Sequence, residues 1–134
     1  MIGFARLGLE EARLYLRHMI GNDKWDTSGG LFNFMDLIGQ GVAFMASDDG
    51  GPLAVIVVEQ VQHAYGGELV VRVAWQLDGC GDITERVLPA IEKQFGQGMK
   101  YATIYTKRAG LVKKLESAGY TEAAKIMRKK LCAH

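Results

Sequence analysis

The residues best suited to chemistry lie in one glycine-containing segment, Gln76-Leu77-Asp78-Gly79-Cys80-Gly81-Asp82. It follows an expected strand and precedes an expected helix. The first N–H groups of a helix have no partner within the helix, and the helix dipole adds positive charge there, so such a junction attracts anions. Glycine lets a phosphate approach the main chain because it has no Cβ. No Gly-Lys-Ser/Thr follows, and the glycine spacing differs from that of a dinucleotide fingerprint, so the segment is neither of those phosphate-binding loops.

The segment resembles the cofactor motif of the GNAT superfamily of N-acetyltransferases, Gln/Arg-x-x-Gly-x-Gly/Ala at the end of the fourth strand. The matching residues are Gln76, Gly79 and Gly81. The apolar strand before the motif and the end of a later helix are also similar to the family; these positions are Val71, Val73 and Trp75, then Leu115-x-x-Ala118-Gly119-Tyr120. The specific resemblance runs from Leu69 to Leu131, about half of the chain.

The resemblance implies an acyl-CoA-dependent N-acyltransferase, which moves the acetyl group of acetyl-CoA to an amine of a small molecule or a protein. It implies that the pantetheine of coenzyme A lies along the splayed fourth strand, against the backbone of Val71 to Val73. It implies that the pyrophosphate lies on the turn, where the cofactor-binding residues are Gln76, Leu77, Asp78, Gly79, Cys80, Gly81 and Asp82. Catalysis is then mostly the positioning of the amine against the thioester, with a base to take its proton.

Two carboxylates are candidates for that base, acting directly or through water. Glu68 opens the motif strand and Glu59 lies on the neighbouring strand; for each, the alternative is a solvated carboxylate at a strand end. His63, in the turn between them, is a candidate proton shuttle or an exposed turn residue. The family often protonates the leaving thiolate with a tyrosine, but Leu115 occupies that position here, and Tyr105 is the catalytic candidate nearby.

Several residues depart from the family pattern and favour an alternative to the transferase function. Asp78 and Asp82 stand in a turn that usually carries a basic residue, and two carboxylates repel a pyrophosphate unless they turn away or cap the helix, as Asp82 is placed to do. Only one strand is expected after Gly119, so we expect an acceptor site that is clipped or completed by a partner, in a homodimer or a virion. Such departures resemble the small GNAT-like proteins of tailed phages, and the alternative function is a non-catalytic GNAT-like structural or interaction protein.

The composition, with 49% hydrophobic and 23% charged residues, indicates one globular domain over residues 1–134, and the resemblance implies that this domain is GNAT-like. A net charge of +1 gives no overall attraction to nucleic acid or to an anionic membrane. The basic residues at 125 and 128–130 therefore indicate a solvated strand edge more than an RNA-binding surface.

No apolar run reaches the length of a membrane span, and no signal peptide is evident, so we expect a cytoplasmic protein. Cys80 and Cys132 are expected as reduced thiols, and Cys80 as a small apolar residue rather than a nucleophile. The cysteines and the histidines His18, His63 and His134 show no metal-ligand spacing, so no metal is expected.

The apolar pattern predicts an α/β fold with a mixed, mostly antiparallel sheet and helices on both faces. Expected strands cover 1–7, 42–46, 53–61, 68–77, 101–106 and 121–131, and expected helices cover 9–20, 31–38, 82–95 and 109–118. The order is β-α-α-β-β-β-α-β-α-β, in which three strands form a meander and a helix then makes a β-α-β crossover. Pro89 is expected to kink the helix over 82–95. The apolar helix over 31–38 is expected as core or as a dimer face.

Overall fold

The structure, a computed structural model, describes residues 1–131 and contains one five-stranded sheet in the order β1-β2-β3-β4-β5. The strands are β1 (Gly3–Arg6), β2 (Val42–Asp48), β3 (Gly51–His63), β4 (Gly66–Gln76) and β5 (Met99–Ile104). The helices are α1 (Leu9–Leu16), α2 (Phe34–Ile38), α3 (Thr84–Phe95) and α4 (Ala109–Ser117). β1 to β4 pair antiparallel, and β4 and β5 pair parallel. The predicted mixed, mostly antiparallel sheet is confirmed.

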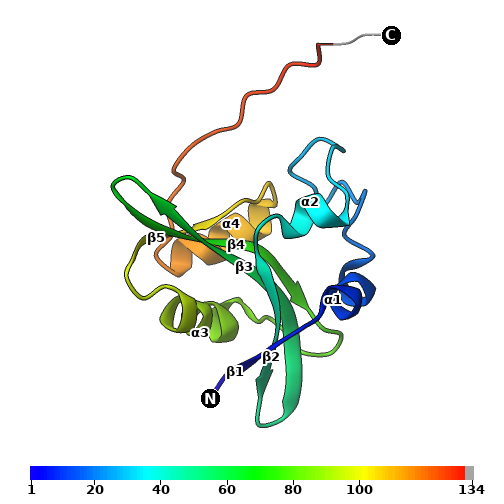
Figure 1. The fold of residues 1–134 in the computed structure, drawn as a ribbon, viewed down its shortest axis with the longest axis vertical. Helices are drawn as coiled ribbons and strands as arrows, with labels where there is room; N and C mark the ends of the chain where they lie inside the picture. The colour runs from blue at the N-terminus through cyan, green and yellow to red at the C-terminus, as the bar shows by residue number, and fades with distance from the viewer. Residues whose placement is uncertain (132–134) are drawn as a thin grey trace.

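The helices cover the two faces of the sheet as separate pairs (Figure 1). α1 and α2 bury Ala12, Leu16, Phe34 and Ile38 against one face, and α3 and α4 bury Ile83, Val87, Leu88, Ile91 and Leu115 against the other. β3 lies in the middle of the sheet, and its alternate residues enter opposite cores because successive side chains of a strand point to opposite faces. Its run Leu53–Val58 is therefore buried throughout, as expected from its β-branched sequence.

Helix bounds differ from the expected ones where local contacts decide them. α1 ends at Leu16, four residues before the expected end at Ile20. α2 begins only at Phe34, because Asn33 caps it: the Asn33 side chain accepts from the N–H of Asp36, and the Asp36 side chain accepts from the N–H of Asn33. α3 continues past Pro89 to Phe95.

The expected last strand is wrong: residues 121–131 form no strand and run as an extended, exposed chain away from the sheet (Figure 1). A strand exists only where its N–H and C=O groups pair with a neighbour. In this segment, the side chain of Arg128 donates to the Thr27 carbonyl at 3.1 Å. Cys132 and His134, which the sequence analysis considered, lie outside the described residues.

β4 contains one residue more than β3 at Arg72, which forms a β-bulge. Val57 of β3 pairs with Val73, but Val58 pairs with Val71, so Arg72 has no opposite residue. An extra residue in one strand exchanges the faces of the side chains that follow. Leu69 and Val71 accordingly lie in the α3/α4 core, whereas Val73 lies in the α1/α2 core.

The side chain of this bulge residue joins β4 to α2 and β3. The Arg72 guanidinium donates to the carbonyls of Leu37 at 3.0 Å and Asp36 at 3.1 Å, and to the carboxylate of Glu59 at 3.2 Å. Gly39, at a φ of 58°, leaves room for it, because a Cβ at Gly39 would lie 2.8 Å from the Arg72 Cζ. The bulge is thus held by a hydrogen-bonded clamp.

We predict that Arg72→Met lowers the free energy of unfolding by about 2 kcal/mol, because Glu59 loses its counter-charge and two carbonyls lose a charged donor. Urea unfolding measures it. Arg86→Met is the control, because the Arg86–Asp48 pair is more exposed and should contribute less to stability. Equal losses in the two variants would contradict the role of the clamp.

Candidate functional site

Beyond the bulge, β4 continues without β5, which ends at Ile104, the partner of Val71. β4 pairs with β5 only from Gly67 to Val71, whereas it pairs with β3 as far as Gln76. The stretch of β4 after Val71 therefore has one open edge, on the side that β5 leaves. We call this unpaired edge of β4, together with the segment that follows β5, the opening between β4 and β5.

The antiparallel ladder shows which backbone groups face this opening. The Leu77 N–H donates to the Leu53 carbonyl at 2.9 Å, so Leu77 points toward β3. Hydrogen-bonded and non-hydrogen-bonded pairs alternate along an antiparallel ladder, so Trp75 and Val73 also point toward β3. The N–H and C=O groups of Ala74 and Gln76 point to the open side, and both residues are exposed.

The turn after β4 presents its glycines to open space. Gly79 and Gly81 have φ values of 79° and 66°, in the left-handed region that glycine adopts readily. Apart from the glycine and its two chain neighbours, no described atom lies within 4 Å of a Cβ built on either residue. The Cys80 N–H donates to the Leu77 carbonyl at 3.2 Å, but within residues 1–131 the N–H groups of Gly79 and Gly81 donate to no protein atom.

Asp82 turns away from the glycines toward the helices. Its carboxylate accepts from the Thr84 N–H at 3.0 Å, in the first turn of α3, and lies 3.3 Å from the ammonium of Lys114 on α4. The hydrogen bond from Thr84, followed by contact with Lys114, lowers the pKa of Asp82. The sequence analysis missed Lys114, which brings positive charge to the turn from 32 residues further along the chain.

Asp78 and Cys80 are the other predicted side chains of the turn. Asp78 is exposed and makes no ion pair with any residue in the described part of the chain. The Cys80 thiol lies 3.4 Å from the Pro52 carbonyl and packs against the α3/α4 core, which fits a small apolar residue. A hollow of about 130 Å³ lies beside the turn, between the start of α3 and the end of α4; its lining residues are Thr84, Glu85, Lys114, Ser117 and Ala118.

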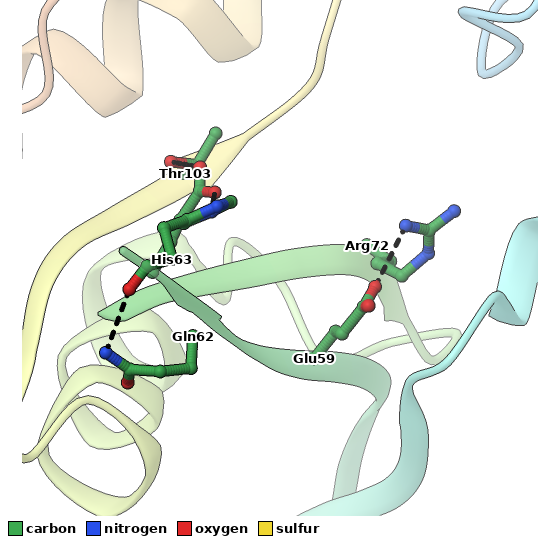
Figure 2. Close-up of polar contacts among 6 residues, drawn as sticks. Glu59, Gln62, His63, Arg72 and Thr103 are labelled. Carbon is green, nitrogen blue, oxygen red and sulfur yellow. Dashed lines mark hydrogen bonds and ion pairs between the residues drawn. The ribbon is translucent and has the colours of Figure 1, made fainter. Parts of the chain in front are cut away.

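Glu68 lies in a chain of hydrogen bonds across the paired part of the sheet. Its carboxylate accepts from Thr103 Oγ1 of β5 at 2.6 Å and contacts His63 Nε2 at 2.9 Å. The bond from Thr103, followed by that from His63, lowers the pKa of Glu68. Figure 2 shows Thr103 and His63 close together at this end of the sheet, with the Glu59–Arg72 pair further along β3 and β4. Glu68 precedes Val71 by three positions, about 10 Å at the rise of a strand.

The remaining candidates divide between the opening and the core. Tyr105 directly follows the end of β5 and is 59% exposed. Tyr120 is turned away, because its hydroxyl donates to Glu92 of α3 at 2.6 Å; burial and that carboxylate raise the pKa of Tyr120. Leu115 is buried in the α3/α4 core.

Two further features of the described chain bear on the kind of site. Over residues 1–131 no group of three or more His, Cys, Asp or Glu side chains is placed to hold a metal ion. In the same range, no helix has the length and apolar character needed to cross a membrane.

Comparisons with solved structures identify the fold. A protein of Bacillus subtilis assigned as an acetyltransferase superposes with a TM-score of 0.70 at 14% identity, over 99% of this chain and all of that chain. One from Clostridium difficile has a TM-score of 0.65 at 12% identity, over 100% of this chain and 99% of the other. One from Clostridium acetobutylicum, solved with acetyl-CoA, has a TM-score of 0.56 at 10% identity, over 97% and 96%.

These similarities show that the chain has the mixed α/β fold of the GNAT acetyltransferases. No protein-family model matches the sequence, and no curated protein sequence matches it. At such low identity the comparisons concern the fold, and the chemistry depends on the residues described above.

We predict that Thr103→Val raises the pKa of Glu68 toward the ordinary 4.5, because it removes the hydrogen bond that lowers this pKa most. Carboxyl NMR titration measures it, with Thr121→Val as the control. Since the native pKa is depressed, ionised Glu68 contributes stability above pH 4.5 and loses it as the pH falls through the depressed value. The stability difference between wild type and Thr103→Val should narrow over that range; a constant difference would contradict the assignment.

Proposed function

We propose that this protein is an acyl-CoA-dependent N-acyltransferase that uses acetyl-CoA and a primary amine. The observation that carries the proposal is the opening between β4 and β5, which adjoins a glycine turn with unpaired N–H groups. The GNAT fold of the chain supports this function. Acetyl-CoA supplies an acyl group activated as a thioester.

The residues at the opening fit this carrier. The N–H groups of Gly79 and Gly81 would hold the pyrophosphate, with Lys114 as a cation beside the turn. For the pantetheine we propose the backbone of Ala74 and Gln76 in place of that of Val73, whose groups point to β3. Asp82 does not oppose an anion at the glycines, because its carboxylate is already bonded to the start of α3.

The chain's own groups handle the protons of the reaction. The acceptor nitrogen bonds to the acyl carbon as the carbon–sulfur bond breaks; one proton leaves the nitrogen and one reaches the sulfur. Glu68 is too far along β4 for direct contact and would take the proton through water, with His63, whose side chain is 58% exposed, leading to solvent. Glu59 pairs with Arg72 and so helps to hold the bulge. Tyr105 is the candidate donor to the sulfur.

The alternative is a non-catalytic GNAT-like interaction protein. It is favoured by the exposed carboxylate of Asp78 in the turn and by the core position of Leu115, which leaves no acid where the family often has a tyrosine. This alternative predicts no release of thiol from acetyl-CoA with any amine.

The decisive experiment is a thermal-shift titration with acetyl-CoA. We predict a rise in Tm, because a ligand that binds only the native state stabilises it by about 2.7 kcal/mol at a hundredfold excess over Kd. S-acetyl-N-acetylcysteamine, which has the thioester but no pyrophosphate, is the control and should give no shift. No rise at millimolar acetyl-CoA would overturn the proposal and favour the alternative.

We predict that Lys114→Met raises the Kd for coenzyme A about tenfold, because a charge-assisted contact to the pyrophosphate is lost. Isothermal titration calorimetry measures it. Lys113→Met is a matched control on the same helix, since both side chains are exposed and only Lys114 reaches Asp82. A Kd that changes equally in both variants would place the phosphates elsewhere.

A further inference from the structure

A cluster of aromatic and basic side chains spans the opening on the side of α1 and α2. Trp25, in the loop between these helices, meets the ring of Trp75 at 5.2 Å between centroids, edge to face. The Arg108 guanidinium lies over the same Trp25 ring, 4.0 Å from its centroid. Trp75 is on the open stretch of β4, and Arg108 follows β5 at the start of α4, so Trp25 links the two diverging strands.

The Arg108 side chain has hydrogen-bonding capacity that residues 1–131 do not use. Stacking on an indole holds the plane of a guanidinium but leaves its N–H donors free at the edges. Arg72 donates to Leu37, Asp36 and Glu59, whereas the half-buried side chain of Arg108 has neither a hydrogen bond nor an ion pair to any described residue. A guanidinium held in this orientation can present two parallel N–H donors, which match two oxygens of a carboxylate or a phosphate.

Two lysines lie near this cluster, one at the Trp25 ring and one near Asp26. The Lys24 ammonium lies 5.4 Å from the Trp25 centroid, and Lys107 is close enough to help lower the pKa of Asp26, after that carboxylate's hydrogen bonds with Ser28 and Gly30. Those bonds occupy Asp26: its carboxylate accepts from the N–H and hydroxyl of Ser28 and from the N–H of Gly30. Arg108, Lys24 and Lys107 outnumber the ionised Asp26, and this excess of positive charge attracts an anion.

We propose that Arg108, Lys107 and Lys24 form, around Trp25, a subsite for the anionic group of the acceptor, which is a small amine carrying a phosphate or a carboxylate. This inference rests on the proposed function and names the class of its acceptor. The subsite includes Trp25 of the loop between α1 and α2, and the glycine turn assigned to the carrier lies beside Lys114 of α4. An anion held at Arg108 would direct the attached amine toward the opening.

The test uses the full chain and its two tryptophans, Trp25 and Trp75, as a binding signal. O-phosphoethanolamine and ethanolamine, which differ only by the phosphate, are titrated separately while indole fluorescence is recorded. β-Alanine and propylamine form a second pair for the carboxylate. The expected result is a saturable change in indole fluorescence with O-phosphoethanolamine or β-alanine, with an affinity that falls as salt is added. Ethanolamine and propylamine should give no change.

Arg108→Met should raise the Kd of the anionic amine at least about tenfold, because the guanidinium fork is lost while an apolar contact with Trp25 remains. Arg13→Met is the matched control, since Arg13 lies over the Phe34 ring at 4.5 Å on the exposed side of α1. Equal binding of phosphorylated and neutral amines, absence of binding by all four probes, or an unchanged Kd in Arg108→Met would overturn the subsite.

The acetyl-CoA titration separates this inference from the proposed function. Arg108→Met should show the same rise in Tm with acetyl-CoA as wild type. Loss of that rise in Arg108→Met alone would assign the cations to the carrier's phosphates and overturn the acceptor subsite, while the transferase proposal would stand. No rise in either protein, together with binding of the phosphorylated amine, would overturn the transferase and leave an anion site.

Discussion

The structure depends on one extra residue in β4. The bulge at Arg72 exchanges the faces of the strand, so that residues before it pack under α3 and α4 and residues after it pack under α1 and α2. It also falls directly after Val71, the last residue that pairs with β5. A β-bulge bends a strand and increases its twist. The same local irregularity therefore accounts for the opening between β4 and β5 and for the aromatic residue, Trp75, that faces Trp25 beyond it.

Because a bulge interrupts the regular ladder, other contacts must hold it. Arg72 does so by bonding to α2 and to Glu59 at once. This gives a structural reason for the carboxylate of Glu59, which the sequence alone offered as a catalytic base. It also explains Gly39, whose backbone conformation and lack of a side chain leave space for the guanidinium. A charged residue near a motif can thus look catalytic in the sequence and, in the structure, hold the motif strand in shape.

The sequence predicted what local patterns control and failed where distant segments meet. The alternating and helical apolar patterns were sufficient for the sheet, the two helix layers and the glycine turn. The bulge was not visible, since Arg72 looks like an ordinary polar residue of a strand. Lys114 and Arg108 were missed because their roles follow from contacts with Asp82 and Trp25, far away in the sequence. The strand expected over 121–131 failed for the same reason: residue types can favour extended backbone, but only a neighbouring edge makes a strand.

The two sides of the opening would specify their ligands by different means. On the α3/α4 side, the groups available to a carrier are mostly main-chain N–H and C=O groups of the turn and the open edge, which depend on the backbone and tolerate change in side chains. On the α1/α2 side, the contacts come from side chains of the 22–33 loop and of the segment after β5. Hydrogen bonds around Asp26 and Ser28 hold the 22–33 loop, and Trp25 is held in place with it. A fold of this kind can keep one carrier while its acceptor changes, because side chains on loops vary without altering the sheet. Under the proposed function, the choice of acceptor would therefore depend on Trp25 and Arg108 and not on the glycine turn.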